Sequence, residues 1–245
     1  MINITKLPVS NILTVFQREF KNYFNTAIGY VFLAIFSLTI NFLFFYLPGF
    51  WDANVASMDN FFSWIRIVYI FFIPAITMRL WAEEKKTGTI EVLFTLPYRS
   101  WEIIIGKYLS ALAFLTVALC STLLIPISLG IISSPDWMII IGGYLGLLFL
   151  GSSYIALGLF ISWMTQDQIV AFLVSMAVSF LFFIMGYPHF LQFMGPLSPV
   201  VAFISLSWHF ESLSRGLFDS RDIIFFITFS FLCLYFNYNS IESRR

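Results

Sequence analysis

The sequence predicts an all-α integral membrane protein with six transmembrane helices, an N-terminal amphipathic elbow helix and a broken re-entrant segment before the last span. The 245-residue chain is 60% hydrophobic, 20% aromatic and only 11% charged, and its mean hydropathy is +0.89. Its charges are separated by apolar runs, several of which exceed the roughly 20 residues that cross a hydrocarbon core. Thirteen basic and thirteen acidic side chains balance, so no nucleic acid or other polyanionic partner is indicated.

An amphipathic helix is predicted near the N-terminus, over residues 11–24. Large apolar residues recur there at helical spacing, and polar residues fall mostly on the opposite side. The apolar set is Ile12, Leu13, Phe16, Phe20, Tyr23 and Phe24, and the polar set is Gln17, Arg18, Lys21 and Asn22. This pattern suits a helix in the plane of the membrane surface. The alternative is a simple extension of the first span.

Six spans are predicted from the apolar runs that follow. Their approximate bounds are 28–47, 61–82, 103–131, 137–164, 169–187 and 223–240. The second contains Arg66 near one end and Arg79 near the other. Both side chains can extend toward the interface, and the apolar residues between them outweigh the cost of inserting an arginine. For Arg66 the alternative is a contact with an anionic substrate or lipid head group.

The segment 187–222 is the hardest part of the chain to place. Its charge-free portion is long enough for a seventh crossing, but Pro188, Gly195, Pro196 and Pro199 interrupt it. The clean apolar run 200–206 is too short to span. Segments of this kind are typical of re-entrant or interfacial structure, here on the external side.

The distribution of basic residues sets the orientation of the first spans. With six spans and both termini inside, ten of the thirteen Lys and Arg residues face the cytoplasm. A seven-span arrangement gives the same ratio, so charge alone does not choose between the two. The proline breaks favour six.

Small residues at spacings of four or eight indicate close helix contacts. Gly142 and Gly146 form one such pair, and Ala171, Ser175 and Ser179 form a ladder in the fifth span. The ladder suits either packing within one subunit or a dimer seam.

The most informative stretch is the charged connection after the second span, residues 79–97. We expect a short helix from about Ile90 to Leu96, capped by Thr87 or Thr89 and stopped by Pro97. Ser100 then begins the next helix, and Glu102 lies near the positive end of its dipole. The alternative is a solvated turn. Four large hydrophobic residues within 90–96 favour a docking surface instead. They are Ile90, Leu93, Phe94 and Leu96.

The residues of this connection resemble the coupling region of ABC-2 type transporter permeases. The matching positions are Arg79, Glu84-Lys85, Gly88-Thr89, Glu91, Leu93, Pro97 and Gly106-Lys107. A second run resembles the branch of gliding-motility-associated and nitrous-oxide-reductase maturation permeases. Its residues are Ser207-Trp208-His209-Phe210, Arg215-Gly216, Asp219 and Arg221-Asp222.

The resemblance implies a single ABC-2 transmembrane domain over residues 1–245 in the bacterial cytoplasmic (inner) membrane. Two copies, or the chain and a paralogue, pair among the lipids, and each docks a cytoplasmic ABC ATPase that binds ATP and Mg²⁺ and drives export. Residues 83–97 would be the coupling helix and 11–24 the elbow helix. The coupling residues implied are Glu83, Glu84, Lys85, Gly88, Thr89, Glu91, Leu93 and Phe94, and the elbow residues are Phe16, Arg18, Phe20 and Lys21.

The residues themselves support a separate source of nucleotide chemistry. No Gly-x-x-x-x-Gly-Lys-Ser/Thr loop occurs in the sequence, so no cofactor and no enzymatic activity are expected in this chain. The rival functions are an ion-coupled secondary transporter and an intramembrane serine hydrolase using Ser152 or Ser153. No metal site is expected at His189 or His209, and His209 with Glu211 suits an ordinary polar pair.

Overall fold

The computed structural model describes residues 8–46, 57–95, 97–132 and 135–243. Within these residues every regular element is a helix. The elements of the first half are α1 (Pro8–Asn25), α2 (Ala27–Tyr46), α3 (Asp59–Thr77), α4 (Arg79–Lys86), α5 (Thr89–Thr95), α6 (Ser100–Ser121) and α7 (Leu124–Ile132). Those of the second half are α8 (Trp137–Met164), α9 (Gln168–Ile184), α10 (Pro188–Phe193), η1 (Gly195–Leu197), α11 (Ser198–Ile204), α12 (Leu206–Ser214) and α13 (Ser220–Glu242).

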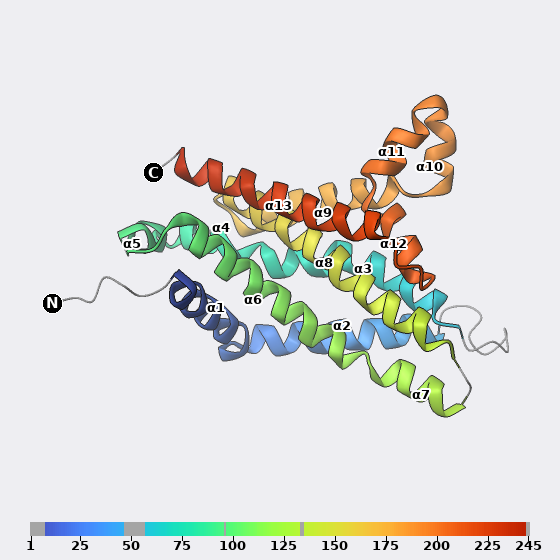
Figure 1. The fold of residues 1–245 in the computed structure, drawn as a ribbon. Coiled ribbons are helices and arrows are strands. Elements are labelled where there is room, and N and C mark those ends of the chain that lie inside the picture. Colours follow the sequence, from blue (N-terminus) through green and yellow to red (C-terminus); the bar gives the residue numbers. More distant parts are fainter. Residues whose placement is uncertain (1–7, 47–56, 96, 133–134, 244–245) are drawn as a thin grey trace.

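The long helices lie side by side as one elongated bundle, and α1 crosses it at one end (Figure 1). The helix α1, the turn between α4 and α5 and the C-terminal end of α13 all lie at this end. The helices α7 and α12 lie at the opposite end. The last long helix, α13, therefore ends at the same end of the bundle at which the first long helix, α2, begins.

Five helical stretches are long and apolar enough to cross a membrane. They are Ala27–Tyr46, Asp59–Lys86, Ser100–Ile131, Trp137–Met164 and Ser220–Glu242. They match five of the six predicted spans, and the second runs further than predicted because α4 continues α3. The remaining predicted span is α9, which is apolar but has only 17 residues, at the lower limit of about 17–25 residues for a span. The six-span count thus stays a prediction.

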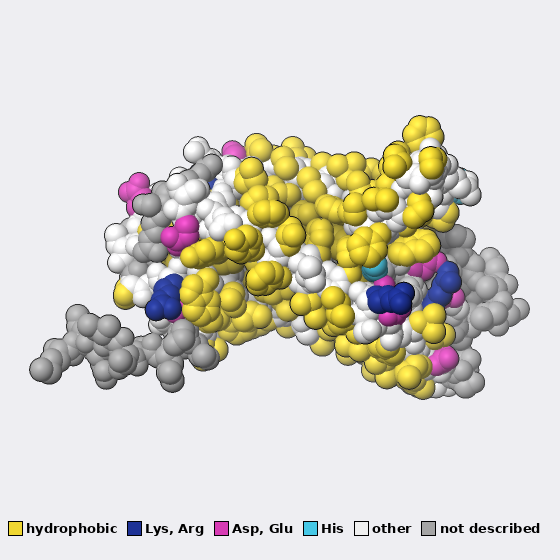
Figure 2. Space-filling model, turned by 45° about the horizontal axis from the view of Figure 1, so that its top comes forward, with side chains coloured by type: hydrophobic (Ala, Val, Ile, Leu, Met, Phe, Trp, Pro, Cys, Tyr) yellow, Lys and Arg dark blue, Asp and Glu magenta, His cyan; other side chains and the backbone are white. Residues whose placement is uncertain are grey.

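The outer surface of the bundle agrees with a lipid environment. Hydrophobic side chains cover the middle of the molecule in Figure 2, and charged side chains gather toward its two ends. Large apolar residues are exposed on several helices, with Leu38 70%, Ile169 68% and Phe231 69% accessible. Monomeric soluble proteins rarely expose apolar patches of this extent.

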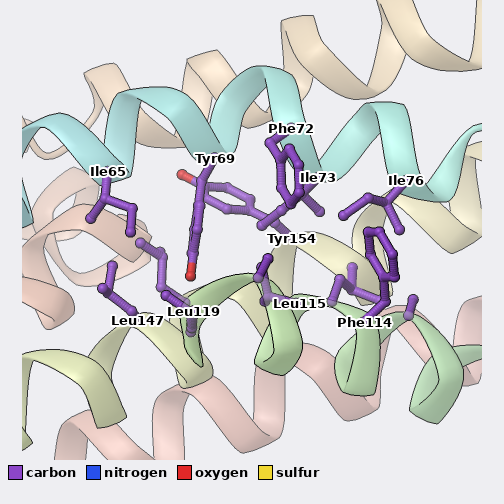
Figure 3. Packing of buried hydrophobic residues seen from close by; sticks show 14 of the residues in the cluster. Ile65, Tyr69, Phe72, Ile73, Ile76, Phe114, Leu115, Leu119, Leu147 and Tyr154 are labelled. Atoms are coloured by element: carbon purple, nitrogen blue, oxygen red, sulfur yellow. The ribbon is translucent and has the colours of Figure 1, made fainter. Parts of the chain in front are cut away.

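The centre of the bundle is α8, whose most apolar 18-residue window is 78% buried. Side chains of α3, α6 and α8 meet there, and Figure 3 shows Tyr69, Leu115 and Tyr154 pointing toward one another from these three helices. All three residues are at most 1% accessible. The packing of these large side chains against one another fixes the three helices together.

Glycines on α8 let its neighbours approach closely. A Cβ at Gly142 would lie 2.8 Å from the Leu213 carbonyl oxygen, and one at Gly146 would lie 3.0 Å from Leu213 Cβ. The spacing of four residues thus marks the line where α12 packs on α8. The expectation that this glycine pair marks a close helix contact is confirmed, and the contact lies within one chain.

The ladder on α9 also packs within the chain. Ala171, Ser175 and Ser179 are at most 1% accessible, and α9 packs on α3 and α8. The ladder therefore packs within the chain in this structure, and its part in a dimer seam stays a prediction. The alternative of packing within one subunit holds.

The segment 187–222 is divided as its prolines and glycines predict. It forms the short helices α10, η1, α11 and α12, and none of these has the length of a span. Gly195, between α10 and α11, has φ +53°, a backbone conformation that glycine adopts at no steric cost. A continuous seventh crossing is therefore absent from these described residues.

Candidate functional site at the charged end of the bundle

The candidate site is built where α1, α4, α5 and the start of α6 meet. The α4 helix continues the line of α3 and ends in Lys85 and Lys86, which suit the negative end of its dipole. Gly88, with φ +70°, reverses the chain, and α5 begins at Thr89. The Thr87 hydroxyl donates to the Glu83 carbonyl at 2.9 Å, which closes the last turn of α4.

The predicted coupling helix is therefore two helices. The expected helix from Ile90 to Leu96 is present as α5, from Thr89 to Thr95, and Leu96 lies outside the described residues. Glu83, Glu84 and Lys85 belong instead to α4, which is an extension of the second span. Gly88 makes this division possible because it supplies the left-handed residue that ends α4.

Lys107 is the centre of the site. Its side chain, on α6, is 1% accessible. The ammonium nitrogen lies 2.8 Å from Glu84 Oε1 on α4 and 3.4 Å from Glu19 Oε1 on α1. It also donates to the Leu80 carbonyl at 2.6 Å and lies 4.8 Å from the centre of the Trp81 ring. One buried cation thus ties three helices together through two carboxylates.

The α1 helix is seated on α6 by shape and by hydrogen bonds. A Cβ at Gly106 would lie 2.7 Å from Val15 Cβ, so only glycine lets the two helices come this close. Asn11 Nδ2 donates to Glu102 Oε2 at 3.1 Å, and the same oxygen accepts from the backbone N–H of Arg99 at 3.0 Å. The predicted helix start at Ser100 with Glu102 in its first turn is confirmed, and Glu102 also anchors α1.

Two aromatic contacts hold α3 and α4 against their neighbours. The Arg79 guanidinium lies 4.3 Å from the centre of the Tyr23 ring, and the Tyr23 hydroxyl donates to the Ile76 carbonyl at 3.3 Å. The Lys85 ammonium lies over the Trp163 ring at 4.0 Å. These cation–π contacts join the start of α4 to α1 and its end to α8.

The surface of the candidate site, between α1 and α4, is formed mostly by polar residues. A cleft of about 260 Å³ opens between α1 and α4. Its lining residues are Arg18, Glu19, Asn22, Thr26, Arg79, Leu80, Glu83, Glu84, Thr87 and Thr89. Glu83, Thr89 and Glu91 are exposed, as are Arg18 and Lys21. Phe16 and Phe20 are half-buried and their rings stack at 5.6 Å.

The hydrophobic residues of α5 face inward rather than outward. Leu93 is 6% accessible and belongs to the main core, and the Phe94 ring lies 6.2 Å from that of Trp163. This chain therefore already covers Leu93, and the expected contact of Leu93 with a partner stays a prediction. Glu84 is likewise engaged by Lys107, so the exposed charges are what the surface offers.

Glu19 was not among the residues expected to form the site, and Lys107 was only a matching position of the family resemblance, with no role assigned to it. One signal in the sequence points to Lys107, because it is the one charged residue in the apolar run 103–135. A cation at such depth requires an acceptor. Its partners are 23 and 88 residues away in the sequence, and spacing alone does not find them.

At the opposite end His209 is paired differently from expectation. Its Nδ1 lies 2.7 Å from Asp222 Oδ1 and its Nε2 lies 2.9 Å from the Phe203 carbonyl oxygen. Glu211 instead contacts Arg215, four residues further on and just past the end of α12. The predicted His209–Glu211 pair is wrong because neighbours on a helix point in different directions, whereas Asp222 of α13 faces the imidazole.

The fold and its apolar belt define a multi-pass membrane protein whose charged end is built from two distant parts of the chain. The chain belongs to the ABC-2 transporter family: the sequence model described as "ABC-2 family transporter protein" matches residues 17–215. Members are membrane components of ABC transporters that lack a nucleotide-binding domain of their own, which implies a partner ATPase subunit. No curated protein matches the chain.

Proposed function

We propose that this chain is the permease subunit of an exporter in the bacterial cytoplasmic membrane, driven by a separate ATPase that docks on the charged end of the bundle. ATP and Mg²⁺ are bound by that partner. The chain contributes the membrane path, and it pairs with a second copy or a paralogue. The finer resemblance to gliding-motility-associated and nitrous-oxide-reductase maturation permeases belongs to the same proposal.

One observation carries this proposal: α1 and the α4–α5 turn, far apart in sequence, share one polar cleft and one buried cation. A solvated turn that merely joins two spans does not need a lysine that is 1% accessible and touches two carboxylates. Such a brace keeps α1 and α4 in a fixed relation, so a push on either element moves both. A docking surface that transmits the movement of an ATPase to the spans requires such a fixed relation between its elements.

The transmission step follows from the same contacts. Closure of paired ATPases displaces the α4–α5 turn. Because α4 continues α3, the displacement passes along the second span. Lys107 passes it to α6, and Glu19 passes it to α1. The displacement thereby reaches all three helices, and their movement opens the path toward one side of the membrane.

The arrangement of the chain supports six crossings with both termini in the cytoplasm. The start of α2 and the end of α13 lie at the same end of the bundle (Figure 1), and this requires an even number of passes. The α9 helix provides the sixth, since 17 residues at about 1.5 Å each extend roughly 25 Å. The basic residues favour the cytoplasm for the end that carries α5.

The proposal is tested by affinity purification of the full chain from its own membranes in mild detergent. We expect an ATPase with a phosphate-binding Gly-Lys-Ser/Thr loop to co-purify, identified by mass spectrometry. The double variant Glu83→Lys/Glu91→Lys reverses two exposed charges and should lose this partner while eluting as the wild type does. Arg221→Glu, an exposed reversal at the other end, is the control and should retain it. Equal recovery of the ATPase with both variants would contradict the docking assignment.

A further inference from the structure

Arg66 is a cation inside the bundle with no anionic partner among the described residues. It lies about 10 Å along α3 from Asp59, at a rise of about 1.5 Å per residue. Its side chain is partly buried, and its Nε is fully buried without a hydrogen-bond acceptor. Its guanidinium carbon lies 5.3 Å from the centre of the Phe210 ring of α12. The side chain is thus covered by α12 instead of extending freely to the surface.

Two buried hydroxyl groups lie beside Arg66. Tyr154 of α8 is 1% accessible and Ser207 of α12 is 5% accessible. The tyrosine and serine hydroxyls lie close to each other, and the Tyr154 hydroxyl lies in the neighbourhood of the Arg66 guanidinium. Neither hydroxyl makes a hydrogen bond of good geometry with the described residues. In Figure 3 the Tyr154 ring reaches from α8 toward α3.

The carboxylate that acts on Arg66 is already engaged. Glu211 follows Phe210 on α12, and its charge favours the arginine, but its carboxylate contacts the Arg215 guanidinium. Glu211 and Arg215 both line the separate hollow on the outer side of α12. The buried Nε of Arg66 therefore remains a donor without an acceptor.

A buried arginine donor and buried hydroxyl groups without hydrogen-bond partners are unfavourable inside a bundle, because contacts within the protein do not replace their lost hydration. Arginine presents a planar fork that matches the oxygen atoms of phosphate and carboxylate. We propose that Arg66, Tyr154 and Ser207 form a binding site for the oxyanion head group of an amphipathic molecule. The exposed apolar surface of the helices can accept its chain. That this molecule is the exported substrate rests on the proposed function, whereas its binding does not.

The test uses the full chain in phosphatidylcholine nanodiscs, without any ATPase, and measures the melting temperature as each probe is added. The probes are dodecyl phosphate, inorganic phosphate and dodecanol. We expect dodecyl phosphate to raise the Tm of the wild type saturably, since a ligand that binds the folded state stabilises it. Dodecanol and inorganic phosphate should give at most a small part of that shift.

The variants decide whether Arg66 carries the effect. Arg66→Met should abolish the shift, and Tyr154→Phe should weaken the apparent affinity several-fold because it removes one donor. Arg221→Gln, an exposed arginine outside the site, should behave as the wild type. Without ligand, Arg66→Met should melt at the same temperature as the wild type or higher, because it removes an unpaired charge.

Four outcomes would overturn the proposal. They are an unchanged shift in Arg66→Met, an equal shift with dodecanol, a full shift with inorganic phosphate, and a lower Tm of ligand-free Arg66→Met. Nanodiscs of phosphatidylglycerol distinguish the source of the head group: a higher Tm of the wild type, but not of Arg66→Met, identifies membrane lipid as the ligand. Because no ATPase is present, failure here leaves the docking proposal intact, and failure of docking leaves this result intact.

Discussion

The Lys107 ammonium nitrogen lies 2.8 Å from Glu84 Oε1, and this contact joins α6 to the helix that continues the second span. Glu19 of α1 shares the same cation at 3.4 Å. Three helices that lie far apart in the sequence are therefore linked through a single side chain. The contact also accounts for the half-buried position of Glu84, which the exposed charges around it do not share.

Removing the cation should destabilise the charged end. Lys107→Met leaves Glu84 and Glu19 without their shared partner, and breaking a buried pair in this way costs about 3–5 kcal/mol. We expect a clear fall in the melting temperature of the purified chain. Adding Glu84→Gln to this variant should recover part of the loss, because the stranded carboxylate is then neutral. A double variant that is no more stable than Lys107→Met would show that the pair is not coupled.

The α5 helix should separate into structural and docking residues. Leu93→Ala removes a buried side chain and is expected to cost about 2–5 kcal/mol in stability. Thr95→Ala, an exposed change on the same helix, should cost far less. If Leu93→Ala melts as the wild type does while partner binding is lost, then Leu93 is a contact residue after all.

The glycine line on α8 should not tolerate side chains. Gly142→Ala places a Cβ 2.8 Å from the Leu213 carbonyl oxygen, so α12 must move and the bundle should lose about 1–3 kcal/mol of stability. Ile141→Ala, on the next residue and 52% exposed, is the matched control and should change the melting temperature little. Equal melting of the two variants would contradict the close packing of α12 on α8.

His209 should depend on Asp222 and not on Glu211. Asp222→Asn weakens the contact with His209 Nδ1 and with the Ser212 hydroxyl, and we expect a loss of about 1–3 kcal/mol. Glu211→Gln breaks only a surface pair with Arg215, which contributes at most about 1 kcal/mol. Thermal melting of the two variants side by side gives the comparison, and a greater loss in Glu211→Gln would restore the sequence-based pairing.

The sequence predicted what depends on local composition and spacing. Apolar length located five spans, glycine spacing located the α8–α12 contact, and Glu102 marked the start of α6. The sequence did not show which neighbour covers a given face. In a membrane protein both the lipid-facing and the core-facing sides of a helix are apolar, so the ladder at Ala171 suited a seam or a core equally well.

The site was predicted only in part for a related reason. The charged connection and the amphipathic N-terminal helix stood out by composition, but Lys107 is defined by partners that only the fold brings near. Leu93 shows a further ambiguity, because an apolar residue among charges suits either a docking contact or a core position, and in this structure it lies in the core. Charge pairs between distant helices leave no periodic signal in a single sequence.

In the proposed function this chain receives its energy from a separate ATPase at the charged end. The most direct test measures ATP turnover in nanodiscs by the purified chain alone, by the chain with its co-purified ATPase, and by the same complex carrying Glu83→Lys/Glu91→Lys. We predict background turnover for the chain alone, stimulated turnover for the complex, and loss of the stimulation in the double variant. ATP hydrolysis by the chain alone, or full stimulation of the ATPase by the double variant, would contradict the claim.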